Sequence, residues 1–182
     1  MMRLVLLLAL SAHCVLSHHD VCYYGWVPYD GYCYGFFLEE VNWILAAASC
    51  SQFGGRLAEV DNEERDKWLI EQAEHRKLGP TWIGGSARLH PGLWFWVPSH
   101  RAVEAYTNWI QGVPINAGHC LEIVYGDKKG WNDRDCSLPR RFICEIKVED
   151  VDDTRETRPA KDKESRDVDD TKETRPGDKE SR

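Results

Sequence analysis

The chain has 182 residues, 42% of them hydrophobic, and a formal net charge of −7 at neutral pH. Its basic residues form no long block, which argues against nucleic acid or an anionic membrane as the main partner. An acidic balance is compatible with cation binding but does not by itself indicate it.

The N-terminal residues have the pattern of a secretory signal peptide. Arg3 supplies the positive start, Leu4 to Ala12 form the apolar run, and the small residues Val15 and Ser17 precede a cleavage site. The alternative, a membrane anchor, needs about 20 apolar residues, and this run is shorter. We therefore expect residues 1–17 to be a signal and the mature chain to be secreted and extracellular, without membrane insertion.

The cysteines point to an oxidising compartment. Cys14 falls within the signal, and an even set of six remains: Cys22, Cys33, Cys50, Cys120, Cys136 and Cys144. Three disulfides are expected from such a set in a secreted chain. A zinc site is the alternative, but the chain lacks the C-x-x-C pairs that such sites commonly use. The sequence alone does not choose among the possible pairings.

Two helices are predicted in the first half of the chain. Apolar side chains recur at helical spacing over Glu39–Phe53, and Gly54-Gly55 stops this helix. The second helix is capped by Asp61 or Asn62 and terminated by Gly79-Pro80.

The second half of the chain has the pattern of short strands around one long loop. Strands are expected over Trp82–Gly85, Leu93–Val97, Cys120–Tyr125 and Arg141–Ile146. The stretch Pro98–Gly118 is rich in turn residues, and loops of this length inside a domain are usually functional. Helices followed by strands indicate an α+β domain.

Composition changes near Lys147. From Glu149 to Arg182 the chain has 13 acidic and 9 basic residues and no Trp, Tyr, Phe, Leu or Ile, so it is expected to be a disordered tail. DVDDTRETRPAKDKESR from Asp150 is followed by DVDDTKETRPGDKESR from Asp167. This two-copy repeat is either a solvated spacer or a multivalent interaction tail. The expected division is therefore signal 1–17, domain 18–148 and tail 149–182.

Several motifs together resemble the C-type lectin-like domain over nearly all of Cys22 to Glu145. They are, in order, Cys50, Gly54-Gly55-Arg56-Leu57, Trp82-Ile83-Gly84, Trp94-Phe95-Trp96, Tyr106-Thr107-Asn108-Trp109, Cys120, Trp131-Asn132-Asp133, Cys136 and Phe142-Ile143-Cys144-Glu145. The resemblance implies a disulfide-stapled α+β fold with two helices, short antiparallel sheets and a long loop region. The repeats after the domain make the layout similar to perlucin-like mollusc shell-matrix proteins.

The same resemblance implies the disulfide pairing. Cys50 would join Cys144, tying the first helix to the last strand, and Cys120 would join Cys136 beside the long loop. Cys22–Cys33 would be the extra N-terminal bridge of the longer family form.

In sugar-binding members of this family, a calcium ion at the tip of the long loop is held by a polar triplet around a proline and by a Trp-Asn-Asp strand. Asn132 and Asp133 match two of those ligand positions. Val113-Pro114-Ile115 replaces the polar triplet, and aliphatic side chains do not bind a hard cation. Asn116 and Glu122 are the nearest substitutes, so a partial, weak calcium and carbohydrate site is expected. Alternatively, Asn132 and Asp133 only hold a turn.

The aromatic residues divide into two groups. Four tryptophans are expected in the core, namely Trp43, Trp82, Trp96 and Trp109, whereas a sugar platform would draw on Trp94, Tyr106 or Tyr125.

The sequence predicts a binding protein and not an enzyme. It contains no G-x-S-x-G, H-E-x-x-H or phosphate-loop motif, and its cysteines are expected to be in bridges. One interpretation is a shell-matrix or other extracellular component with weak or altered calcium-dependent carbohydrate binding, whose partners are glycoproteins or a mineral surface. The alternative is a glycan-recognising lectin of innate immunity. The substitutions at Val113 and Ile115 weaken the alternative, and the tail repeats favour the matrix protein.

Removing the tail should leave the stability of the domain unchanged. A chain that ends at Val148 should melt within about 2 °C of the full chain by calorimetry, because a solvated tail contributes little to folding. A large drop in melting temperature would mean that the tail docks on the domain.

Overall fold

The structure, a computed structural model, describes residues 22–114 and 118–149. The expected signal peptide, the candidate ligand Asn116 and the repeats from Asp150 onward lie outside the described residues. Within the described ranges, no helix is both long and apolar enough to cross a membrane.

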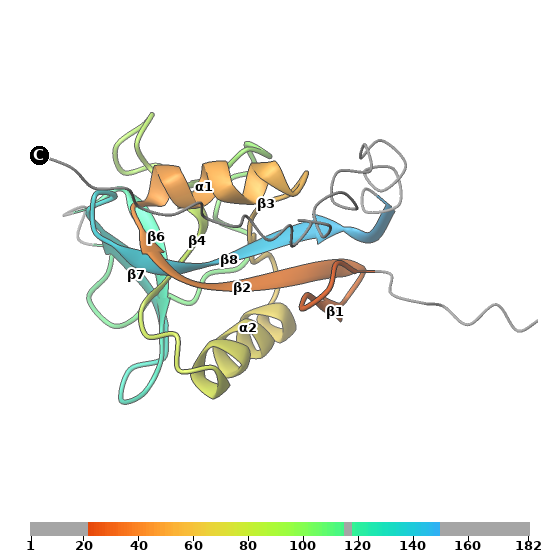
Figure 1. The fold of residues 1–182 in the computed structure, drawn as a ribbon. Helices are drawn as coiled ribbons and strands as arrows, with labels where there is room; N and C mark the ends of the chain where they lie inside the picture. The colour runs from red at the N-terminus through yellow and green to blue at the C-terminus, as the bar shows by residue number, and fades with distance from the viewer. Residues whose placement is uncertain (1–21, 115–117, 150–182) are drawn as a thin grey trace, which may run out of the picture.

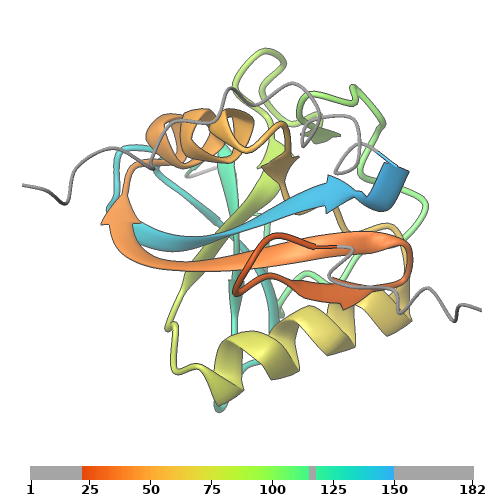
Figure 2. The same ribbon diagram turned by 45° about the vertical axis from the view of Figure 1, so that its right-hand side comes forward.

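The described chain forms one sheet with a helix on each side. Figures 1 and 2 both show α1 on one side of the long β2–β8 pair and α2 on the other. The main path through the sheet is β1-β2-β8-β4-β6-β7, with β3 paired to β8 and β5 paired to β4. The β4–β8 pair is parallel and the other strand pairs are antiparallel. The elements are β1 Val27–Tyr29, β2 Tyr32–Val41, α1 Trp43–Gln52, β3 Arg56–Leu57, α2 Glu63–His75, β4 Thr81–Ser86, β5 Phe95–Trp96, β6 Cys120–Val124, β7 Gly130–Arg134 and β8 Arg140–Lys147.

Helix α1 is shorter than the sequence predicts. The prediction of Glu39–Phe53 was wrong at its start, because β2 continues to Val41 and pairs there with β8. Asn42 then caps the helix, and its side-chain oxygen accepts a hydrogen bond from the Leu45 N–H at 2.9 Å. Such a cap stabilises a helix start by about 1 kcal/mol, which fixes where the strand ends and the helix begins.

Helix α2 starts where the sequence predicts. Of the two candidate caps, the structure selects Asn62, whose side-chain oxygen accepts from the Arg65 N–H at 2.8 Å. The helix ends at His75, before the Gly79-Pro80 turn that was expected to terminate it.

The expected strands are present with changed lengths. Trp82–Gly85, Cys120–Tyr125 and Arg141–Ile146 correspond to β4, β6 and β8, but the strand expected over Leu93–Val97 is reduced to the two residues of β5. The hairpin of β1 and β2 was not predicted. It forms the edge of the sheet, and the N–H of Val148 donates to the carbonyl oxygen of Gly31 at 3.1 Å. The start of β2 and the end of the described chain therefore lie together at that edge.

The sheet divides the apolar core into two layers. On the α1 side, Trp43 and Trp82 pack with the Cys50–Cys144 disulfide, as expected for core tryptophans. On the α2 side the larger layer contains Trp96 and Trp131.

The three residues proposed as a sugar platform belong to the scaffold on the α2 side of the sheet. Trp94 is buried in the core and lies edge-on to Trp109, with 5.1 Å between ring centroids. The hydroxyl of Tyr125 accepts from the Gly79 N–H at 2.7 Å, and the hydroxyl of Tyr106 donates to a buried carboxylate. Of the three alternatives for a sugar platform, Trp94 is the one whose ring is buried in the core beneath the loop.

The three disulfides are those that the resemblance implies. They join Cys22 to Cys33, Cys50 to Cys144 and Cys120 to Cys136. The second closes a loop with a sequence separation of 94 residues, for which chain entropy predicts about 4–5 kcal/mol of stabilisation.

A buried carboxylate fastens the long loop to the rest of the domain. Asp66 on α2 is fully buried and accepts hydrogen bonds from Trp131 Nε1 at 2.6 Å, Asn108 Nδ2 at 2.5 Å and the Tyr106 hydroxyl at 3.0 Å. Burial raises the pKa of Asp66, and the three donors oppose that rise. One side chain thus connects α2, the loop and β7, next to the candidate ligand Asn132.

Replacing Asp66 by Asn should destabilise the domain by about 2–4 kcal/mol, because a neutral amide accepts weakly and turns its own N–H groups toward three donors. Urea denaturation followed by tryptophan fluorescence measures this change. Asp127→Asn, an exposed aspartate in the β6–β7 turn, is the matched control and should change stability little. Equal stability of the two variants would show that Asp66 does not hold the loop.

The guanidinium of Arg56 forms ion pairs with two buried carboxylates. Glu59 and Glu145 are both buried, and Arg56 Nε lies 3.2 Å from Glu59 Oε1 and 2.9 Å from Glu145 Oε1. Arg101 also reaches Glu59, at 2.7 Å. Burial raises the pKa of Glu145 to about 7, with Arg56 lowering it and the charge of Glu59 raising it further. Glu145 therefore titrates near neutral pH.

This pKa makes stability depend on pH in a defined direction. A carboxyl whose pKa rises on folding from 4.5 to about 7 contributes stability that is full below pH 4.5 and is lost as the pH rises through 7. Between pH 5.5 and pH 8 the free energy of unfolding should fall by about 2 kcal/mol from this group. In Glu145→Gln that part of the fall should disappear, whereas the exposed control Glu104→Gln should keep it. Identical pH profiles for the wild type and Glu145→Gln, measured by urea denaturation, would contradict the assignment.

Candidate functional site

The long loop connects β4 to β6, and its described residues contain one short strand, β5. It is held by the Asp66 hydrogen bonds and by an isolated bridge between Trp109 and Trp131 of β7. The described part of the loop reaches the cis Val113–Pro114 peptide and resumes at Gly118. The irregular loop predicted over Pro98–Gly118 is thus confirmed for the described residues, and it meets β7 where the candidate ligands lie.

The register of β6 and β7 separates the two best candidate ligands. Glu122 pairs with Asn132, and Leu121 pairs with Asp133. Directly paired residues share a face and successive residues alternate, so Asn132 faces the same side as Glu122, whereas Asp133 faces the opposite side. The Nδ2 of Asn132 donates to Glu122 Oε1 at 3.0 Å. The structure therefore brings Asn132 and Glu122 together and directs Asp133 away from them.

Glu122 is held by arginines. It is buried, its Oε2 lies 2.8 Å from Arg140 Nε, and its Oε1 lies 3.3 Å from Arg134 Nε. Arg140 in turn lies over the ring of Trp82 at 5.9 Å from the centroid. Both carboxylate oxygens have charged donors, so the arrangement is that of an internal ion-pair network that orients the β6–β7 hairpin.

Asp133 lies under the end of the loop. Its side chain is buried, and Oδ2 accepts from the Gly118 N–H at 3.4 Å. Position 118 cannot hold a side chain unless the backbone moves, because a Cβ there would lie 2.0 Å from the carbonyl carbon of Arg134. The backbone therefore passes directly against β7, and Asp133 fastens it there. This matches the alternative in which the carboxylate holds a turn.

These positions do not fit a complete calcium site. Calcium takes six to eight oxygen ligands, usually several from carboxylates. Val113 supplies no side-chain oxygen, and both carboxylate oxygens of Glu122 are engaged by arginines. Across residues 22–114 and 118–149, no three His, Cys, Asp or Glu side chains gather as a metal site. Asn116, the remaining candidate, lies outside these ranges.

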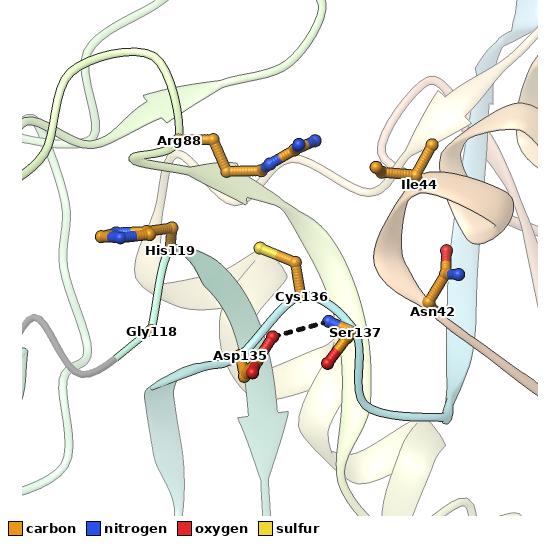
Figure 3. Close-up of a pocket in the computed structure, with 8 residues that line it drawn as sticks. All are labelled: Asn42, Ile44, Arg88, Gly118, His119, Asp135, Cys136 and Ser137. Carbon is orange, nitrogen blue, oxygen red and sulfur yellow. Dashed lines mark hydrogen bonds between the residues drawn. The ribbon is translucent and has the colours of Figure 1, made fainter.

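A separate polar pocket lies at the start of α1 (Figure 3). Its volume is about 530 Å³, and it is lined by Asn42, Ile44, Arg88, Gly118, His119, Asp135, Cys136 and Ser137. None of these side chains was singled out from the sequence as a ligand-binding residue. The one sequence feature that could have pointed to this pocket is the position of Asp135, between the Trp-Asn-Asp motif and Cys136. We call this cavity the Arg88–Asp135 pocket.

The charges of this pocket face each other. In Figure 3 Arg88 extends over the cavity and Asp135 lies on its opposite side. The N–H of Ser137 donates to Asp135 Oδ1 at 2.9 Å, and this bond, with further help from the Ser137 hydroxyl, lowers the pKa of Asp135. The Arg88 guanidinium has no hydrogen-bond or ion-pair partner among the residues that the structure describes. The pocket therefore presents one ionised acceptor and one available donor.

Comparison with known proteins agrees with this architecture. Residues 39–146 match the model of the lectin C-type domain. The chain is 32% identical over 145 residues to the galactose-specific lectin nattectin of Thalassophryne nattereri, covering 75% of this chain and 87% of that protein. It is also 32% identical over 129 residues to a perlucin-like protein of Mytilus galloprovincialis, covering 68% and 81%.

A solved structure shares both the fold and part of the sequence. The C-type lectin carbohydrate-recognition domain of mouse scavenger receptor superposes with a TM-score of 0.62 at 27% identity, covering 69% of this chain and 98% of that domain. The resemblance seen in the sequence motifs is therefore confirmed by sequence matches and by three-dimensional likeness. The chain belongs to the C-type lectin domain family, and its domain is a non-enzymatic binding domain.

Proposed function

We propose that this chain is a secreted extracellular protein that binds carbohydrate or glycoprotein, with a weak or altered contribution from calcium at the long loop. The observation that carries the proposal is the arrangement on β6 and β7. Both oxygens of Glu122 are engaged by arginines, and Asp133 faces away from Asn132. A lectin scaffold is thus combined with a loop in which Val113 and Ile115 stand at the positions of two oxygen ligands.

Secretion is supported by the cysteine usage and the N-terminal pattern. Three disulfides persist in oxidising compartments, and the apolar run after Arg3 is of signal-peptide length.

A role in an extracellular or shell matrix is supported by two observations. The chain is similar to a perlucin-like protein, and its sequence continues after the domain with two copies of an acidic DVDD repeat. Closely spaced carboxylates are suited to bind calcium ions or the surface of a calcium mineral. In this role the domain binds glycoprotein and the repeats bind mineral. A test is retention of the full chain on calcium carbonate powder, which should be lost when the chain is cut after Val148.

Calcium binding by the domain should be weak. Calorimetry of residues 18–148 should show no calcium site of micromolar affinity. A calcium ion that binds must replace its lost water ligands with protein oxygens, and the side chains of Val113 and Ile115 contain none. Val113→Glu together with Ile115→Asn should strengthen binding at least about tenfold, since two oxygen ligands are restored.

The control for this measurement is Asp127→Ala, which removes an exposed carboxylate elsewhere. One calcium bound with micromolar affinity by the unmodified domain, and abolished by Asp133→Ala, would contradict the proposal.

A further inference from the structure

The Arg88–Asp135 pocket has the size and the rigidity of a small-molecule site. Its volume of about 530 Å³ lies within the range of roughly 300–1,000 Å³ that is typical of ligand pockets. The Cys120–Cys136 disulfide fixes its floor, and the N–H of Trp43 donates to the Cys136 carbonyl oxygen at 3.0 Å. The floor at Cys136 is therefore fixed by covalent and backbone bonds, whereas the exposed Arg88 side chain is ordered on binding.

The sides of the pocket come from distant parts of the chain. Asn42 is the cap of α1, Arg88 follows β4, and Asp135 follows β7. On a fourth side, the His119 N–H donates to the carbonyl oxygen of Arg134 at 3.1 Å. The polar groups of the pocket are thus positioned by several secondary-structure elements, which is also how binding sites on rigid scaffolds are arranged.

The facing charges restrict the chemistry of a ligand. A simple anion would be attracted by Arg88 and repelled by Asp135. A simple cation would be attracted by Asp135 and repelled by Arg88. A neutral ligand with several hydroxyl groups avoids both conflicts, because one hydroxyl oxygen accepts from the guanidinium while another hydroxyl donates its proton to the carboxylate. Each of these hydrogen bonds involves an ionised group and is among the stronger kind.

The remaining lining favours a ring that carries several hydroxyls. Ser137 and Asn42 supply neutral polar atoms beside the charged pair. Ile44 also lines the cavity and is 50% exposed, so it offers an apolar surface to C–H groups. A sugar residue has this division, with hydroxyls around the ring edge and C–H groups on its face.

We propose that the Arg88–Asp135 pocket is a calcium-independent subsite for a neutral sugar residue. This inference rests on the proposed carbohydrate binding and assigns it to a place outside the Asn132–Asp133 position. It gives the lectin scaffold a polar recognition site that does not depend on calcium ligands from the long loop. Arg88 donates to the ring hydroxyls and Asp135 accepts from them, and Ile44 packs on the ring face.

The test uses the full chain in the presence of a chelator. The probes are the methyl glycosides of galactose, mannose, glucose and N-acetylglucosamine, titrated with detection by protein-observed NMR. At least one glycoside should bind with a millimolar dissociation constant and should shift the methyl resonances of Ile44. Arg88→Ala and Asp135→Asn should each weaken that binding at least about tenfold, because each removes a charge-assisted hydrogen bond.

Two exposed residues of the β6–β7 turn provide matched controls. Asp127→Asn and Lys128→Ala make the same kinds of charge change away from the pocket and should leave the affinity unchanged. Near-ultraviolet circular dichroism of every variant checks that the disulfide-stapled core is intact.

Three results would overturn the inference, and they separate it from the proposed function. Binding that requires calcium, is lost in Asp133→Ala and survives in Arg88→Ala would leave carbohydrate binding standing and place it at the loop. Binding only of glucosamine or glucuronate, through one of the two charges alone, would mean that the pocket takes a charged ligand. Binding of no glycoside with or without calcium would refute both the subsite and the proposed function.

Discussion

The carboxylate of Asp66 is the contact that holds the long loop and β7 against α2. The described part of the loop has little regular structure beyond the two-residue β5, so the cost of its conformational entropy must be offset by anchors. Asp66 receives an indole, an amide and a phenol donor, two from the loop and one from β7, and it does so in a fully buried position. Removing a buried acceptor leaves three donors without a partner, which is more damaging than losing a contact at the surface. The anchor holds the irregular loop against α2 at Tyr106 and Asn108.

The residues of the Trp-Asn-Asp motif have structural roles in this domain that do not require a cation. The tryptophan of the Trp-Asn-Asp motif points into the core and bonds to Asp66, so it is needed for folding. Its two neighbours are held as well, Asn132 by Glu122 and Asp133 by the loop backbone at Gly118. All three residues of the motif therefore have a structural reason to stay, even if no cation is bound. The presence of the Trp-Asn-Asp motif therefore indicates the C-type lectin fold, and it does not by itself indicate that calcium binds.

The parts that could be predicted from the sequence were those encoded locally. Asn62 before a run of acidic residues marks the start of α2, and Trp82-Ile83-Gly84 marks a buried strand. The disulfide pairing followed from the family resemblance and not from spacing. Strand β2 was missed, because its end resembles the start of a helix until the pairing with β8 is known. The side that Glu122 faces depends on the β6–β7 register, and the Arg88–Asp135 pocket joins residues that are far apart in the chain, so neither is visible in a linear pattern.

The pairing of β2 with β8 gives the domain two distinct ends. At one end, Tyr32 pairs with Lys147 and Val148 bonds to Gly31, so the described chain enters and leaves there. At the other, Val41 pairs with Arg140, and the pocket at the start of α1 follows directly. A ten-residue strand is about 30 Å long. A bead, a sensor surface or a second module joined at Cys22 or Glu149 would therefore lie at the end of the β2–β8 pair opposite to the pocket.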